Sequence, residues 1–295
     1  FEARFCRDWI RPMVVRMNGA ESDEAYLSSF GSNLRVALDS YDQLSSGMER
    51  LIEKFAATTR VMLNTRAQAL DVEGSRVRGF VVKNERGQEQ RLFADAVCVA
   101  LPAPLAAALV QPHAGDLAAL LRQVRYFPVH VIVAQYKRAI FRPEIRAVIF
   151  DESSVLSNAG AYGTGDLGTV RYTFSGRVAR RLLAEGVDDE ELLTRAEQTL
   201  NPYVPVGKSD RILVVSRTFD PGLCAFTVDT RGLNHRLDNQ ASLGGVFFTG
   251  DYRKGASIEA CFVAARECAG RMASAAGREA EVFGGAPSLV PRVEG

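Results

Sequence analysis

The sequence predicts an α/β protein, and three observations support this class. Two continuous apolar runs, residues 95–100 and 246–249, are typical of strands buried on both faces of a parallel sheet. Residues 258–272 carry apolar side chains at helical spacing, which predicts a long helix with a single packed apolar stripe after the second run and a glycine turn. Residues 65–93 contain short strand-like segments separated by glycine turns, a pattern that predicts three antiparallel strands.

The first half of the chain reads as one α/β unit with an inserted meander. We expect helices over 23–38 and 47–57, a short strand at 61–63, the three antiparallel strands, the buried strand and then a helix over 103–110. In the second of these helices four residues share one apolar face: Met48, Leu51, Ile52 and Phe55. Pro102 ends the buried strand and opens the helix that follows it.

The middle of the chain predicts a mixed sheet with helices packed on it. The expected strands are 126–136, 146–150, 169–174 and 211–219, and the expected helices are 177–185 and 189–200. An acidic run at 188–191 stands at the positive end of the second helix, where it stabilises the helix dipole.

Composition limits the class of partner. The 295 residues include 36 Lys and Arg against 35 Asp and Glu, for a net charge of +1, and 47% are apolar. A chain of this size and apolar content builds a buried core, as one large domain or two interleaved ones, which excludes disorder. Without clustered basic residues, nucleic acid is not expected as a partner. The longest apolar run, 96–110, is too short to span a bilayer.

The cysteines and the first residues indicate compartment and context. The five cysteines, Cys6, Cys98, Cys224, Cys261 and Cys268, form no C-x-x-C pair, so a metal site and a redox motif have no support. An odd number of dispersed thiols favours a reducing compartment, and we expect a cytoplasmic protein. The chain starts at Phe1 without an initiator Met or a signal peptide, and we expect it to be part of a longer chain.

The strand–turn–helix near the C-terminus is the most specific motif. Gly250 allows close backbone approach to a ligand, Asp251 offers a carboxylate to sugar-type hydroxyls, and the helix beginning near Ser257 points its positive end at the same place. These parts suit a nucleotide cofactor that carries a polyol chain and becomes anionic. An equally weighted alternative is a core strand that merely ends in an aspartate-containing turn.

The residues GVFFTGDYRKGASIEACFVAARECAGRM resemble the closing flavin-binding motif of the flavin-containing amine oxidase superfamily, which includes monoamine oxidases, protoporphyrinogen oxidases and phytoene desaturase-like enzymes. Two upstream segments, SSGMERLIEKFAATTRVMLNTRAQALDVEGSRVRGFVV and FADAVCVALPAPLAAALV, are similar to the adenosine-contacting part of the same family. The resemblance implies the C-terminal part of a two-domain FAD-binding fold of the glutathione-reductase type, with the mixed-sheet substrate domain interleaved.

The resemblance also implies positions for the cofactor and for the domains. Main chain at Ala67 would lie along the adenine, Ala100 near the adenosine, Asp251 on the ribityl chain or phosphate, and Ser257 and Ile258 near the pyrimidine carbonyl of the flavin. The FAD-binding part would comprise 46–122 and 245–277, and the substrate domain 1–45 and 123–244, followed by a loosely ordered tail at 278–295.

The family's glycine-rich strand–turn–helix, which wraps the pyrophosphate, does not precede the first expected helix. A literal G-x-G-x-x-G is present at 163–168, but it leads into a strand rather than a helix, so we interpret it as a hairpin loop. We therefore expect the pyrophosphate-binding segment in residues outside this chain or in a separate subunit. No metal is expected.

Lys137 is the candidate catalytic residue. It follows a strand end in VIVAQYKRAIF, similar to the strand of monoamine oxidases whose lysine holds a water against the reactive flavin nitrogen. The alternative is an ordinary exposed lysine beside Arg138. Cys224 falls near a position where some family members attach flavin covalently, although a buried structural thiol is the favoured interpretation. The three histidines are isolated in sequence and indicate no triad or zinc site.

The resulting functional hypothesis is a flavin-dependent oxidoreductase that oxidises a small or apolar organic substrate by hydride transfer to FAD. Two alternatives stay open: a carotenoid desaturase or porphyrinogen-type oxidase, and a non-catalytic subunit or fragment that binds no flavin alone. The segment around Phe5 and Trp9, with its neighbouring arginines, is either a peripheral membrane contact or a core anchor, and the second is favoured.

Overall fold

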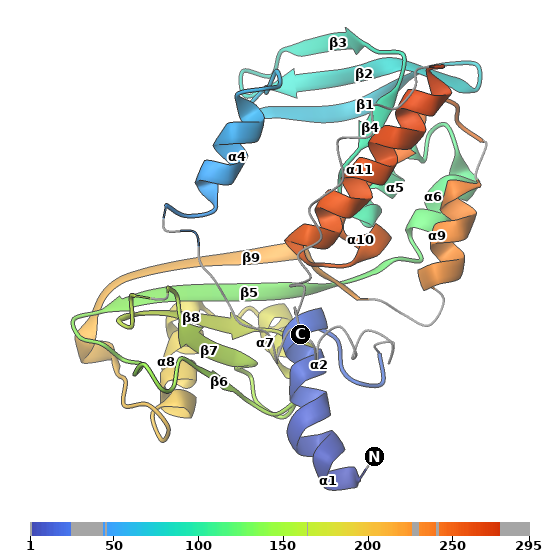
Figure 1. The fold of residues 1–295 in the computed structure, drawn as a ribbon. Coiled ribbons are helices and arrows are strands. Elements are labelled where there is room, and N and C mark those ends of the chain that lie inside the picture. The colour runs from blue at the N-terminus through green and yellow to red at the C-terminus, as the bar shows by residue number, and fades with distance from the viewer. Residues whose placement is uncertain are drawn as a thin grey trace, which may run out of the picture. The chain divides into compact units, whose positions relative to one another are not determined.

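The computed structural model describes residues 2–24, 44, 46–163, 165–225, 230–239 and 242–277, which form two compact units (Figure 1). The first unit comprises 1–64 and 119–239, and the second comprises 65–118 and 240–295. The helix expected over 23–38 falls almost wholly outside the described residues, as does the tail at 278–295. The structure groups 46–64 with the first unit, whereas the sequence analysis assigned this segment to the FAD-binding part.

A five-stranded sheet forms the centre of the first unit. Its strand order is β6 (Ala147–Ile149), β7 (Asn158–Ala161), β8 (Thr169–Phe174), β5 (Arg125–Tyr136) and β9 (Arg211–Ala225). Every pair of neighbouring strands is antiparallel, so the prediction of a mixed sheet was wrong for these strands. Antiparallel strands need only short connections, and the loops between β6, β7 and β8 are of this kind.

Two helices contribute to the core of this unit, α7 (Gly176–Ala184) and α8 (Asp189–Leu200). Alternate residues of β5, such as Ile132 and Ala134, belong to the same buried cluster as Leu192, Leu193 and Ala196 of α8. The acidic run stands at the start of α8, as predicted, and its first residue also caps the helix: the Asp188 carboxylate accepts a hydrogen bond of 2.7 Å from the amide of Glu191.

The N-terminal segment of the first unit is helical, which the sequence analysis did not predict. It runs through α1 (Ala3–Phe5), η1 (Cys6–Ile10) and α2 (Arg11–Asn18) and ends at Gly19, whose φ of 65° suits glycine. Ile10, Val14 and Val15 are buried, whereas Trp9 is 64% exposed. The buried residues anchor the segment in the unit, while the Trp9 side chain lies at its surface.

The expected helix over 47–57 is present as α4 (Glu49–Ala56). No α4 residue is buried, and Ile52 and Phe55 of its apolar face are 62% and 49% exposed. The prediction of a strand at 61–63 was wrong: these residues form a coil and a turn that lead into β1. The first unit also contains α9 (Thr230–Asp238).

The second unit begins with the predicted three-stranded meander, which is confirmed. The strands β1 (Thr65–Glu73), β2 (Arg76–Asn84) and β3 (Glu89–Phe93) pair in chain order and antiparallel. A short parallel pair, β4 (Val97–Val99) and β10 (Val246–Phe248), forms a separate sheet. Helix α5 (Ala103–Val110) follows β4 with the predicted boundaries, and α6 (Gly115–Leu121) follows at the unit boundary.

The last elements of the second unit are a four-residue helix, α10 (Asp251–Lys254), and the long helix α11 (Ile258–Ala275). Figure 1 shows α11 in red beside β4 and α10. The predicted apolar stripe of α11 is only partly packed, because Ala264 and Cys268 are buried while Ile258 and Phe262 are 58% and 44% exposed. The expectation of a single fully packed stripe was therefore wrong.

Candidate functional site in the second unit

The carboxyl ends of β4 and β10 meet, because the two strands are parallel and in register. Val99 pairs with Phe248, and the amide of Thr249 donates to the carbonyl oxygen of Val99 at 3.2 Å. Ala100 and Gly250, both candidate cofactor residues, directly follow these positions. Ligands of open α/β sheets bind outside the carboxyl ends of parallel strands, so this is the edge at which a nucleotide is expected.

The turn after β10 requires glycine at its first position. Gly250 has a φ of 144°, which side-chain-bearing residues rarely adopt, and a Cβ atom there would lie 3.0 Å from the ring of Tyr252. The Tyr252 ring is 1% exposed, and its burial raises the pKa of the phenol. The buried ring of Tyr252 therefore leaves no room for a side chain at Gly250. The next residue, the half-buried Asp251, begins the short helix α10.

Helix α11 begins at the candidate residues Ser257 and Ile258. The Ser257 hydroxyl accepts a hydrogen bond of 3.1 Å from the amide of Ala260, so its side chain serves as the helix cap. The amides of Ile258 and Glu259 come before the first bonded turn and have no partner within the helix. A long helix with amides directed outward at its positive end is suited to a negatively charged or electron-rich ligand group.

Ala67 lies on the edge strand of the meander, at an irregularity. The register of β1 against β2 shifts between Ala67 and Ala69, which leaves Gln68 as the extra residue of a bulge. A bulge redirects the backbone groups around it, and Ala67 is exposed. All six candidate cofactor residues therefore lie in one compact unit, with Ala67 on a different sheet from Ala100 and Gly250.

Lys137, the candidate catalytic residue, lies in the first unit. It follows the end of β5, where its amide donates to the carbonyl of Asp210 at 2.8 Å and its Nζ donates to the carbonyl of Ser209 at 3.2 Å. The side chain is exposed. The structure thus shows an ammonium group that a backbone carbonyl holds at the surface of this unit, and its catalytic role stays a prediction.

Two secondary motifs behave as the favoured interpretations expected. The described residues of this motif, 163 and 165–168, lie in the hairpin loop between β7 and β8, where the Asp166 carboxylate accepts hydrogen bonds from the amides of Gly168 and Thr169. The hydrogen bond with Thr169 is the main reason that the pKa of Asp166 is lowered. Cys224 is 2% exposed within β9, as a structural thiol should be.

A buried polar network in the first unit escaped the sequence analysis. The Glu197 carboxylate accepts hydrogen bonds from Tyr136 Oη at 2.7 Å and from Arg211 Nε and Nη2 at 2.6 and 2.7 Å. Tyr136 Oη also contacts Tyr172 Oη at 2.7 Å. Burial raises the pKa of both tyrosines, whereas the hydrogen bonds of Glu197 raise the pKa of Arg211. All four side chains are nearly inaccessible, so the network stabilises the unit and does not form an open site.

His130 is the second group that sequence spacing did not reveal. Its Nδ1 lies 2.8 Å from Thr218 Oγ1 of β9, and its Nε2 lies 3.1 Å from Asp189 Oδ1 at the start of α8. Burial lowers the pKa of His130, and the nearby Asp189 opposes this effect. Ser216 Oγ donates to Asp189 rather than to the histidine, so the geometry is not that of a hydrolase triad.

The described part of the chain contains no group of three or more His, Cys, Asp or Glu side chains placed to hold a metal ion. Among the same residues, no helix has both the length and the apolar character that crossing a membrane requires.

Comparison with known proteins identifies the family. A family model described as "Flavin containing amine oxidoreductase" matches residues 4–273, which is most of the chain. The chain belongs to the flavin-containing amine oxidoreductases. The resemblance of the strand–turn–helix at 246–275 is therefore confirmed at the level of the family, and the family implies a flavin cofactor.

Solved structures support the same fold. The crystal structure named "Putative protoporphyrinogen oxidase from Exiguobacterium sp. 255-15" superposes with a TM-score of 0.69 at 16% sequence identity and covers 92% of this chain. The chain described here matches 63% of the length of the Exiguobacterium protein. The curated proteins gave no match.

The residues of the second unit fit one part of a flavin nucleotide. A glycine turn and a half-buried carboxylate stand at the carboxyl ends of two parallel strands, and α11, with its unbonded first amides, follows a few residues later in the same unit. These groups offer acceptors to hydroxyls and donors to a carbonyl or phosphate. The G-x-G-x-x-G of the hairpin loop, in contrast, opens no helix and provides no pyrophosphate cradle.

Proposed function

We propose that this chain takes part in flavin-dependent oxidation of a small or apolar organic substrate, in which a substrate C–H bond gives hydride to FAD. The observation that carries the proposal is the juxtaposition of Ala100 and Gly250 at the carboxyl ends of β4 and β10, with Asp251 next in the chain and α11 following in the same unit. Bound flavin would supply the two-electron acceptor. Family membership makes this nucleotide the expected occupant.

The residues of the chain would bind the flavin nucleotide and polarise its pyrimidine carbonyl. Asp251 would accept hydrogen bonds from the ribityl hydroxyls, and the amides of Ile258 and Glu259 would point at the pyrimidine carbonyl. A helix N-terminus stabilises negative charge that develops at such a group, which favours the reduced cofactor. Ala67 and Ala100 would line the adenosine side with main chain, where small side chains leave room. Lys137 would orient a water or an oxygen molecule.

The open edge of the parallel sheet suggests how the rest of the nucleotide is held. Val97 and Val99 hydrogen-bond to β10, so the backbone N–H and C=O of Cys98 face the other edge of β4. Among the described residues this sheet has two strands, whereas parallel sheets in α/β proteins are larger and covered. We propose that a glycine-rich strand–turn–helix adds at this edge, as further chain or as a separate subunit.

One observation favours the second enzymatic candidate, a desaturase or porphyrinogen-type oxidase with a large apolar substrate. On the face of β5 opposite α8, Val131 and Val133 are half-buried, and Val133 pairs with Val215 of β9. Val215 and its neighbour on this face, Leu213, are 54% and 56% exposed. An extended apolar sheet face suits an apolar substrate better than an aromatic cage for amines.

The test is flavin binding measured by visible absorbance, on the purified chain and on the complex recovered with it. We expect a bound flavin spectrum, and we expect Asp251→Asn to weaken binding by about 10-fold or more, because a hydrogen bond to a charged group contributes about 1.5–3 kcal/mol. Asp116→Asn, in the first turn of α6, is the matched control and should bind normally. If neither preparation holds flavin, the non-catalytic alternative replaces the proposal.

The role of Lys137 has its own test. Lys137→Met should slow flavin reduction or reoxidation in stopped-flow measurements, because a cation near the reacting centre orients water or oxygen. Lys208→Met replaces another exposed lysine of the same unit and should leave both rates unchanged. Equal half-reaction rates in wild type and Lys137→Met would remove Lys137 from the site.

A further inference from the structure

Two thiols of the second unit lie in direct contact. Cys98 Sγ on β4 and Cys268 Sγ on α11 are 3.5 Å apart, although 170 positions separate them in the chain. Cys98 is exposed and Cys268 is 1% exposed. The pair therefore joins an accessible sulfur to a buried one across the interface between the parallel sheet and the long helix.

The surroundings of the pair favour a thiolate on Cys268. The Cys98 thiol donates a hydrogen bond to Cys268, and the guanidinium groups of Arg271 and Arg253 lie near it, so the pKa of Cys268 is lowered to about 7. The same hydrogen bond, with burial, raises the pKa of Cys98. The contact therefore favours loss of a proton from the pair, with the remaining proton shared between the two sulfurs.

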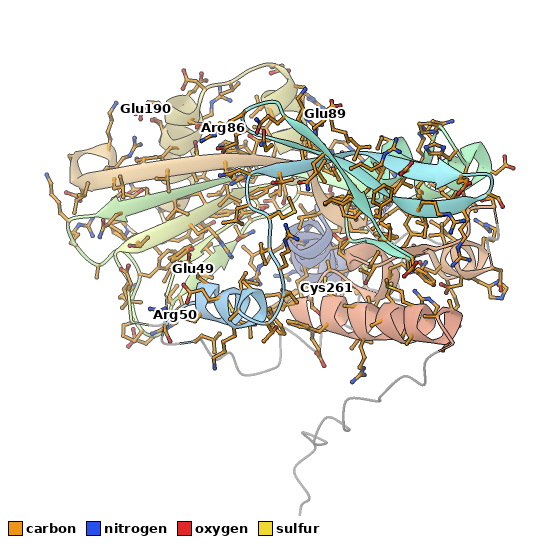
Figure 2. All side chains as sticks on the ribbon, turned by 90° about the horizontal axis from the view of Figure 1, so that it is seen from above. Glu49, Arg50, Arg86, Glu89, Glu190 and Cys261 are labelled. Atoms are coloured by element: carbon orange, nitrogen blue, oxygen red, sulfur yellow. The ribbon has the colours of Figure 1, made fainter. Side chains whose placement is uncertain are left out.

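The two sulfurs are within reach of one another. A disulfide has an S–S length of about 2.05 Å, so the sulfurs must approach by about 1.5 Å, the difference from the observed 3.5 Å. Both side chains have a rotatable bond to sulfur, and neither lies in a turn. Cys261, labelled on α11 in Figure 2, lies two helical turns before Cys268, and burial raises its pKa. The other two cysteines belong to the first unit.

We propose that Cys98 and Cys268 form a reversible disulfide that ties β4 to α11 when the chain meets a small-molecule disulfide. Transfer of the shared proton to Cys268 gives a Cys98 thiolate, which attacks one sulfur of the small disulfide and releases a first thiolate. The Cys268 sulfur then loses its proton, attacks the Cys98 sulfur and releases a second thiolate. In sum, two protein thiols are oxidised, and one small disulfide is reduced to two thiols.

The proposed link lies next to the candidate site but rests on the sulfur geometry alone. Cys98 is two residues before Ala100, and Cys268 lies ten residues into the helix that begins at Ile258. A covalent tie between the two elements would restrict their relative movement. The disulfide forms or fails to form whether or not the chain binds flavin, so its test is independent of the proposed function.

The experiment equilibrates the full chain with oxidised and reduced glutathione at several ratios. Remaining thiols are then alkylated under denaturing conditions, and the protein is analysed by mass spectrometry. Fully reduced protein should take up five alkyl groups, one for each cysteine, and oxidised protein should take up three. Peptide mapping should recover one linked pair that contains Cys98 and Cys268, and excess dithiol should restore five.

Three variants decide the assignment. Cys98→Ser, at an exposed position, should keep four alkylated thiols at every glutathione ratio. Cys268→Ser should form no internal link and should instead accumulate a glutathione adduct on Cys98, because no second thiol is left to displace it. Cys261→Ser, on the same helix, should still lose two. Oxidation should also raise the midpoint of thermal unfolding of the wild type and leave that of Cys98→Ser unchanged. Three results would each overturn the proposal: five alkylated thiols in the oxidised wild type, a stable glutathione adduct without a link in the wild type, or loss of two thiols in Cys98→Ser.

Discussion

Breaking the buried network around Glu197 should strongly destabilise the first unit. Its carboxylate is the common acceptor for the Arg211 guanidinium and the Tyr136 hydroxyl, at 2.6–2.7 Å. Glu197→Gln keeps the volume, removes the charge and turns one acceptor into a donor. Arg211, whose side chain is 7% exposed, would then keep only the carboxylate of Glu190 as an ionic partner. Breaking a buried pair in this way costs about 3–5 kcal/mol.

The assay is urea denaturation followed by circular dichroism, with hydrogen exchange of β5 and α8 peptides to locate the loss. Glu190 marks the exposed end of the network (Figure 2), where Lys208 Nζ contacts it at 2.7 Å. Lys208→Gln removes that outer contact and should leave the free energy of unfolding unchanged. Combined Glu197→Leu and Arg211→Met should be more stable than Glu197→Gln, because no unpaired charge stays buried. A loss below about 1 kcal/mol in Glu197→Gln would refute this reasoning.

Three further outcomes follow from single residues. Gly250→Ala should lower the free energy of unfolding by about 1–3 kcal/mol, because the positive φ of Gly250 strains any other residue. Gly270→Ala, in open space on α11, should raise it by up to about 1 kcal/mol, and thermal unfolding measures both changes. Ser257→Ala should cost about 1 kcal/mol through loss of the helix cap, as measured by urea denaturation. Burial lowers the pKa of His130, so this histidine binds a proton more tightly in the unfolded chain than in the folded one. The free energy of unfolding should therefore fall as the pH drops below about 6.5, the ordinary pKa of histidine. His130→Asn should flatten this part of a profile of stability against pH.

Elements with a local chemical signal were predictable from the sequence. The meander was found because glycine turns interrupt strand-like segments, and α5 because Pro102 fixes its start. Strand β7 has the sequence NAGA, which lacks strand-forming residues. Its position is set by pairing with β6 and β8, and by the tight fit of Gly160, where a Cβ would lie 3.2 Å from the carbonyl oxygen of Arg146. Such long-range constraints leave no mark on a local pattern.

The helices α4 and α11 show what helical spacing of apolar residues cannot predict. Helical spacing of apolar residues correctly located both helices, but it predicted a packed stripe on α11, where Ile258 is exposed, and it gave no sign that Ile52 of α4 is exposed as well. Periodicity reports that a face is apolar, and it does not report what covers that face. Exposed apolar side chains on α4 and α11 therefore have to be found from the structure.

Some functional groups could be recognised from sequence spacing, and others could not. Gly250, Asp251 and Ser257 lie within eight positions, so the strand, the glycine turn and the helix cap could be recognised together. Glu197 and Arg211 were missed because their meeting depends on how α8 packs against the sheet, which no spacing rule encodes. The contact between Cys98 and Cys268 is of this second kind as well. A motif search finds groups that the backbone brings together locally, whereas chemistry assembled by tertiary packing has to be read from distances.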